Sequence, residues 1–274
     1  MKKRILLIAC LVTSCFASDV LAQSSYVSFN VGYGLPMNAQ SLESIDFNST
    51  TENGTATTYE EEKVSLGKGL RATAAFGRMF TPYIGAEISV SYLMGGKSEA
   101  IQRDDNSNYY NKLTLSSSMI SATPTIIFSA GLEKINPYAK IGFIVGSSTI
   151  KYAGDADNDG DIDKFEYKLN GGLAMGFSSS IGATYPLNEK MSLFGELNII
   201  SLSYAPTKGE LVKASSDGQD LLPGATVSQK EIDFVDSYTY DNQNPPSDDK
   251  PAQELKQYFS YGSIGINFGL KISF

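Results

Sequence analysis

The chain has 274 residues, of which 42% are hydrophobic, and this excludes a protein that is disordered throughout. Its 25 glycines, 16 tyrosines and 14 phenylalanines favour strands and turns, while histidine and tryptophan are both missing. The formal net charge of −8 argues against a nucleic-acid partner and favours small cations or basic partners.

Residues 1–22 are predicted to be a cleaved signal peptide. Three basic residues at positions 2–4 precede a mostly apolar segment, 5–16, which is too short to span a bilayer. Ala22 supplies the small residue that signal peptidase prefers, so cleavage is expected before Gln23.

Both cysteines lie inside this leader. Cleavage before Gln23 would therefore leave a mature chain with no cysteine and no disulfide. The alternative is a lipoprotein-type cleavage at the sequence VTSC, which would leave a lipid-anchored Cys15, but its apolar segment, containing Cys10, would be very short.

After the leader, apolar and polar residues alternate repeatedly, which is typical of strands with one apolar face. The clearest case is the last segment, where six large apolar residues alternate with small or polar ones from Ile264 to Phe274. The pattern predicts eight strands, at residues 26–34, 70–80, 83–94, 113–128, 138–146, 175–185, 191–204 and 264–274.

The connections between these strands alternate between short turns and long polar loops. The predicted long loops are 35–69, 95–112, 147–168 and 205–258. This alternation predicts an all-β protein, with residues 23–274 forming an eight-stranded antiparallel up-and-down transmembrane β-barrel whose termini are both periplasmic. Because EIDFVDSYTY, residues 231–240, is a candidate arm of an extra hairpin, a ten-stranded barrel is the alternative.

The apolar face of the strands is predicted to point outward. A soluble lipocalin-like barrel would place its apolar face inside and charged residues outside. Here the polar face consists mostly of Gly, Ser, Thr and Asn, which suit the narrow interior of an eight-stranded barrel, so the large residues would face lipid. The few charges on that polar face are expected to form an internal ion-pair network: Arg71, Glu87, Lys140, Glu196 and Lys271. The alternative for Lys271 is a solvated position at the periplasmic rim.

The chain resembles the small outer-membrane β-barrel proteins of Gram-negative bacteria, the porin-like family that includes the OmpA and OmpX barrels. The resemblance rests on the leader, the eight strands, the segments PYAKIGFIVG (137–146) and YPLNEKMSLFGELN (185–198), and the end INFGLKISF. It implies a monomer in the cell outer membrane whose partners are outer-membrane lipids and lipopolysaccharide. It also implies that Phe274 is a signal for the barrel-assembly machinery.

Architecture is better specified than function, because one fold hosts many roles. The enzymes among small outer-membrane barrels use a histidine, and this chain has none, so a non-enzymatic structural or surface-binding role is predicted. Eight strands leave no aqueous channel once side chains fill the lumen, and this argues against transport. A narrow porin for small solutes is therefore kept as the first alternative function and not as the main prediction. A soluble periplasmic lipocalin-like binder is the second.

The third long loop contains a calcium-loop pattern, DADNDGDIDKFE. Six acidic residues stand at the ligand positions, and Gly160 stands where such a loop turns sharply. The sequence predicts a Ca²⁺ site, as a tentative cofactor, formed by Asp155, Asp157, Asp159, Asp161, Asp163 and Glu166. The flanking residues are typical of strands rather than the usual helices, which argues against high affinity, and a simple acidic loop tip is the alternative.

Overall fold

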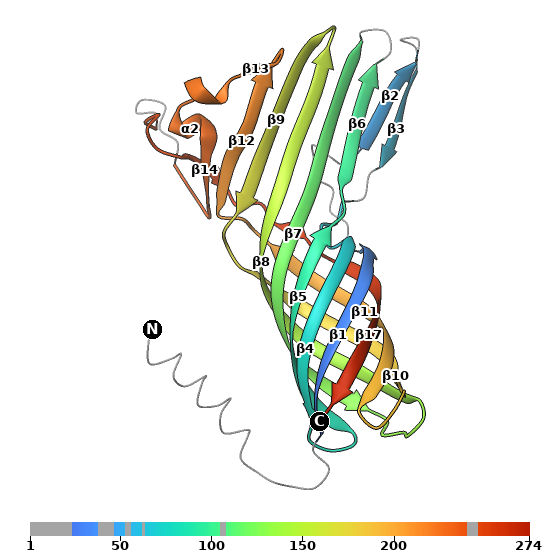
Figure 1. The fold of residues 1–274 in the computed structure, drawn as a ribbon. Coiled ribbons are helices and arrows are strands. Elements are labelled where there is room, and N and C mark those ends of the chain that lie inside the picture. The colour runs from blue at the N-terminus through green and yellow to red at the C-terminus, as the bar shows by residue number, and fades with distance from the viewer. Residues whose placement is uncertain (1–23, 38–46, 53–55, 62–63, 105–107, 240–245) are drawn as a thin grey trace.

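The computed structural model describes residues 24–37, 47–52, 56–61, 64–104, 108–239 and 246–274 (Figure 1). The predicted signal peptide and the Cys15 alternative lie outside these residues. No helix within the described residues is both long enough and apolar enough to cross a membrane.

Eight antiparallel strands form a closed ring, and each corresponds to one of the eight predicted strands. Neighbours in the chain order of these eight pair with one another, and the last pairs with the first, from Tyr26 opposite Ser273 to Pro36 opposite Ser263. The ring consists of β1 (Ser24–Pro36), β4 (Gly69–Met79), β5 (Ile84–Gly95), β7 (Tyr109–Ser129), β8 (Asn136–Asn158), β10 (Ala174–Pro186), β11 (Met191–Tyr204) and β17 (Ser263–Ser273).

The ring is apolar outside and polar inside, as the alternation predicted. Phe268 on the outside is 66% exposed, whereas Ser28 on the inside is 3% exposed. Along β17, every second side chain from Ile264 to Phe268 is an exposed apolar one, and glycine or asparagine lies between them. This is the reverse of the arrangement expected for a soluble lipocalin-like barrel.

Two strands of the ring continue far beyond it and form the centre of a second sheet (Figure 1). β7 has 21 residues and β8 has 23, while β4 has only 11. At a rise of roughly 3.4 Å per residue, about half of β8 stands above the ring. The added strands are β2 (Phe47–Glu52), β3 (Ala56–Glu61), β6 (Ser98–Asp104), β9 (Asp161–Asn170), β12 (Lys208–Ser216), β13 (Gln219–Asp220), β14 (Glu231–Val235) and β15 (Ala252–Leu255).

Each segment predicted as a long loop therefore contributes strands to this upper sheet. The two short helices, η1 (Leu222–Gly224) and α2 (Val227–Lys230), lie within the last of these segments. The candidate extra arm forms β14, which pairs with β12 and β15 and not with a strand of the ring. Most of these strands are short and polar, so their alternation gave little signal of pairing.

The polarity of the two faces reverses where β7 and β8 leave the ring. On the ring's outer side, β8 carries Ile141 and Phe143, but further along the same face it carries Thr149 and Lys151. On the inner side the change is opposite, from Lys140 to Ile150 and Tyr152. β7 reverses at the same level. Of its large exposed apolar residues on the outer face, Ile120 lies nearest to the upper sheet, and it pairs with Ser147.

An apolar core closes the ring at this level. Leu66, Tyr204 and Tyr261 are almost fully buried there, together with residues of the ring such as Ile144 and Ile200. Two segments without long strands enter from above and are tied together, since Leu66 N donates to Ser260 O at 2.9 Å and Ser65 Oγ donates to Gly262 O at 2.6 Å. We call this core the plug; it also includes Phe259 of β16 (Phe259–Ser260).

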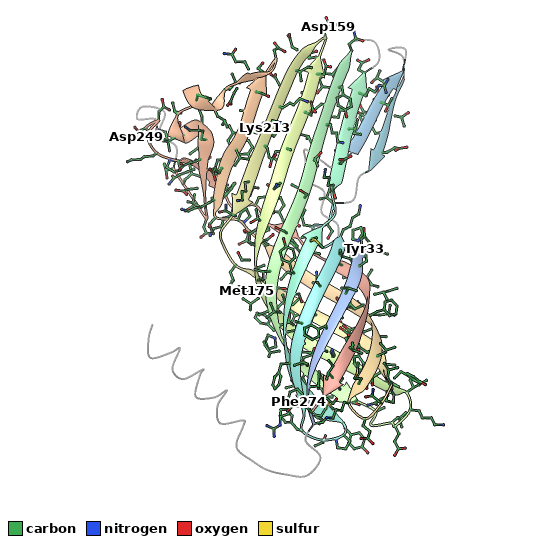
Figure 2. The ribbon with its side chains drawn as sticks, viewed as in Figure 1. Tyr33, Asp159, Met175, Lys213, Asp249 and Phe274 are labelled. Atoms are coloured by element: carbon green, nitrogen blue, oxygen red, sulfur yellow. The ribbon has the colours of Figure 1, made fainter. Side chains whose placement is uncertain are left out.

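Figure 2 shows how these parts are spaced along the molecule. Phe274 lies at the end of the ring where the chain ends, and Asp159 lies at the far end of the upper sheet (Figure 2). Tyr33 and Met175, both exposed, lie near the junction between ring and sheet. The short turns between consecutive ring strands, β4–β5, β7–β8 and β10–β11, lie at the Phe274 end, which we call the turn end.

Candidate functional sites

The first candidate site is an ion-pair cluster inside the ring. Lys140 of β8 lies between two carboxylates from other strands, with its Nζ 3.1 Å from Oε1 of Glu87 and 3.5 Å from Oε2 of Glu196. The side chains are only 14%, 6% and 6% exposed, respectively. Each is placed by the same alternation that directs every second residue of its strand into the ring.

Neutral donors complete the coordination of both carboxylates. The Tyr26 hydroxyl donates to Glu87 at 2.7 Å, and the Tyr138 hydroxyl donates to Glu196 at 2.9 Å. Asn267 Nδ2 donates to the second oxygen of Glu196 at 3.0 Å. These bonds matter because a buried ion pair is stable only when its remaining hydrogen-bonding capacity is satisfied.

The predicted network is thus confirmed for three of its five members. Among the described residues, neither Arg71 nor Lys271 forms an ion pair. Lys271 instead places its Nζ 3.9 Å from the centre of the Tyr26 ring, a cation–π contact. The sequence does not identify Tyr26 and Tyr138 as partners of the carboxylates, although both stand at inward positions of the alternation.

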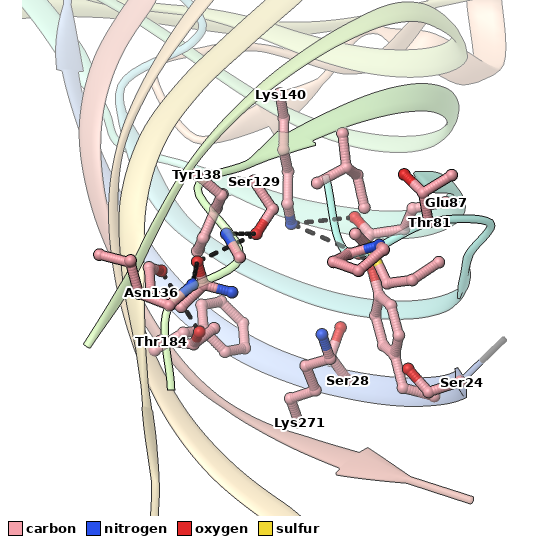
Figure 3. Close-up of a pocket in the computed structure, with 17 residues that line it drawn as sticks. Ser24, Ser28, Thr81, Glu87, Ser129, Asn136, Tyr138, Lys140, Thr184 and Lys271 are labelled. Carbon is pink, nitrogen blue, oxygen red and sulfur yellow. Dashed lines mark hydrogen bonds and ion pairs between the residues drawn. The ribbon is translucent and has the colours of Figure 1, made fainter. Parts of the chain in front are cut away.

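The ion-pair cluster separates two spaces in the ring. Toward the turn end lies a cavity of about 280 Å³, which we call the vestibule; Lys271, Lys140, Tyr26, Ser28, Ile127 and Leu132 are among its lining residues (Figure 3). Toward the plug lies a space of only about 60 Å³, which Arg71 and several serines and threonines line. The interior is therefore blocked twice, by the ion-pair cluster and by the plug.

The second candidate site is the segment that carries the calcium-loop pattern, and it forms a tight β-hairpin. β8 ends at Asn158 and β9 begins at Asp161, so only two residues connect the strands. These are Asp159, with φ 56°, and Gly160, with φ 100°. Two successive residues with positive φ are what a two-residue hairpin turn requires, and this explains the glycine without a metal.

The hairpin divides the predicted ligands between its two faces. Asp155 and Asp157 share one face of the hairpin with the residues opposite them, Lys164 and Ile162. Glu166 is two residues from Lys164 along β9, so it lies on the same face. Asp161 and Asp163 pair with Asn158 and Ala156 on the opposite face. Among the residues that the structure describes, no three carboxylates, cysteines or histidines are grouped closely enough to hold a metal ion.

Several of these acidic side chains already have partners in the hairpin. Lys164 Nζ lies 3.1 Å from Asp155, and Lys151 Nζ lies 3.8 Å from Glu166. Asp157 accepts a hydrogen bond from the Gly160 amide at 3.0 Å, and Asp159 accepts one from Asn108 at 3.3 Å. Calcium binding by these residues therefore stays a prediction.

The two faces of the upper sheet offer different chemistry. The face that continues the outside of the ring carries cross-strand ion pairs, and one of them joins Lys112 Nζ to Glu99 Oε1 at 2.9 Å. The hydrogen bond between these two side chains raises the pKa of Lys112. The face that continues the interior carries an aromatic row, in which Phe165 lies 5.5 Å from Tyr152 and 5.9 Å from Tyr167 between ring centres. Burial raises the pKa of Tyr167.

Comparison with protein families matches residues 8–220 to the outer membrane protein beta-barrel domain. The chain therefore belongs to this family, and its location is the outer membrane. No curated protein matches the chain.

We predict that Lys140→Met will lower the free energy of unfolding by about 3–5 kcal/mol, because it leaves Glu87 and Glu196 buried without a cation. Urea unfolding of the protein refolded in lipid vesicles measures this effect.

The matched control is Lys164→Met, which removes the exposed pair with Asp155 and should change stability by about 0–1 kcal/mol. Equal losses in the two variants would show that the interior cluster contributes no more than a surface pair.

Proposed function

We propose that this protein is a closed, non-enzymatic outer-membrane β-barrel that holds a rigid β-sheet at the cell surface for binding or a structural role. The observation that carries the proposal is the continuity of β7 and β8, which run from the ring into the upper sheet without a break. Nineteen register pairs join the two strands, from Tyr109 opposite Asn158 to Ser129 opposite Tyr138.

The polarity reversal supports this placement. Below it, the outer face of the ring is apolar, which suits contact with lipid, and each ring strand pairs with a neighbour on both sides. Above it, the same face carries charged pairs, which suit water. Membrane lipid would therefore end near Ile120 and Ser147, and the upper sheet would stand outside the membrane.

The contents of the ring favour binding over transport. The ion-pair cluster lies within the lumen and the plug lies at its upper end, and both support a closed barrel over a narrow porin. The absence of histidine from the whole sequence supports a non-enzymatic role, and Lys140 is held between two carboxylates rather than beside a nucleophile.

We further propose that the protein is a monomer with both termini in the periplasm, and that it contacts outer-membrane lipids and lipopolysaccharide through the exposed apolar band. Phe274, 70% exposed at the turn end, is the proposed signal for the barrel-assembly machinery. Its amide donates to Ser25 O at 2.9 Å, so its backbone belongs to the ring while its side chain is presented outward.

Single-cysteine labelling tests the proposed orientation. A cysteine in place of Lys213, exposed on the upper sheet, should react with a membrane-impermeant maleimide on intact cells (Figure 2). A cysteine in place of Glu189, exposed in the β10–β11 turn, should react only after lysis. The opposite pattern would invert the topology and remove the surface role.

Planar-bilayer recording tests closure. The purified protein should give no discrete conductance steps, because the ion-pair cluster and the plug both fill the lumen. Reproducible steps of one size would refute the closed barrel and support the narrow porin; a parallel recording from refolding buffer with detergent alone excludes detergent artefacts.

Calcium binding at the hairpin tip is a separate proposal, supported by the number of carboxylates within residues 155–166. Because the ligands lie on two faces, binding requires the end of the hairpin to rearrange, so we expect one weak site with a Kd on the order of 10⁻⁴–10⁻³ M. Calorimetric titration of the folded protein measures this.

Glu166→Gln should abolish or weaken that heat, while the control Glu231→Gln, at an exposed position of β14, should leave it unchanged. No saturable heat from the unmodified protein at millimolar calcium would leave the hairpin as a solvated acidic tip.

A further inference from the structure

The vestibule combines an accessible mouth with a charged wall. Its rim includes Thr81 and Pro82 from one turn and Gly131 and Leu132 from another, and all four residues are exposed. Its floor is the ion-pair cluster, since Glu87 and Lys140 line it. A molecule of modest size can therefore enter from the turn end but cannot pass beyond the cluster.

The described interior of the ring has more cations than anions. Its inward positions carry three cations, Arg71, Lys140 and Lys271, but only two carboxylates, Glu87 and Glu196. Both carboxylates bond to Lys140, and no described carboxylate lies within ion-pair distance of Lys271. Arg71 lines the separate space toward the plug, so Lys271 is the vestibule cation that no described carboxylate pairs with.

Lys271 is positioned to receive an anion. It lies opposite Ser28 in the β1–β17 pairing, and Figure 3 shows the two side chains next to each other at the cavity wall. Its Nζ contacts the Tyr26 ring at 3.9 Å, which orients the ammonium without using any of its three hydrogen-bond donors on a carboxylate. The Tyr26 hydroxyl is itself committed to Glu87, so Lys271 and Ser28 are the free polar partners on this wall.

Part of the remaining vestibule wall is apolar, and this favours an anion that has an apolar part of its own. Met79, Ile127, Leu132 and Phe194 also line the vestibule. A bare inorganic anion would leave these side chains without contact, whereas a carboxylate attached to a small apolar body would use both kinds of wall. The volume of about 280 Å³ limits that body to the size of one ring or a short chain.

We propose that the vestibule binds a small carboxylate with an apolar body, with the carboxylate on Lys271 and Ser28 and the apolar body against Ile127, Leu132 and Phe194. The site opens at the turn end, and it is separate from the surface sheet and from the calcium-loop hairpin.

Benzoate is a suitable probe, titrated by calorimetry into the full-length mature protein in detergent, with protein-free micelles as the blank. Lys271→Met should weaken benzoate binding by about tenfold or more, because it removes the charge-assisted contact. Lys271→Arg should retain most of the affinity. Lys190→Met, at an exposed turn lysine, is the control and should bind like the unmodified protein.

Lys271 makes no ion pair with a described residue, so its replacement should leave the protein folded, and unchanged urea unfolding checks this. Equal binding of benzamide and benzoate would show an apolar pocket without anion recognition and overturn the proposal. Binding of inorganic phosphate but not benzoate would overturn the assignment to a carboxylate. Absence of saturable benzoate heat, or equal affinity in Lys271→Met, would remove the site altogether.

Discussion

The structure depends on two different surroundings acting on the same pair of strands. In lipid, a strand must pair all its backbone groups and turn its large apolar side chains outward. In water, a sheet keeps charged residues on its exposed face and apolar residues on the other. β7 and β8 meet both demands in one continuous hairpin, and the reversal near Ile120 and Ser147 is the physical result.

The reversal also explains why the lumen is closed at that level. Once the inner face becomes apolar, its side chains need partners, and the segments around Leu66 and Tyr261 supply them. Below the plug the inner face is polar and carries charge, so the lumen there is filled by Lys140, its two carboxylates and the tyrosines that bond to them. Apolar packing above and charge pairing below are two ways of closing the same narrow lumen.

Much of the ring could be predicted from the sequence because its signal is local. Period-two alternation from Ile264 to Phe268, and its counterparts in seven other segments, specifies both the strands and the face that each residue takes. Pairing among charges is not local: nothing in the spacing of Glu87, Lys140 and Glu196 distinguishes them from Arg71, which has no such partner among the described residues. Only the relative register of the strands decides which inward charges meet.

The calcium-loop hairpin shows how one pattern serves two conformations. Asp-Gly at the centre favours a tight two-residue turn as much as a metal loop, and the acidic residues on either side of it are themselves register partners in the two strands. The sequence predicts loops where the upper strands lie for a related reason. Short segments such as Ser98–Asp104 become strands because β7 extends beside them, and this neighbour is not visible in their own sequence.

The length of the β7–β8 ladder also has a mechanical consequence. A pull on the tip near Asp159, directed away from the membrane, acts along the strands and loads many backbone hydrogen bonds at once in shear. Such a ladder resists force far better than one that opens a bond at a time from its end. The same strands are fixed on both sides by neighbours in a ring with no free edge, so a load at the tip would pass into the whole barrel rather than into a single loop.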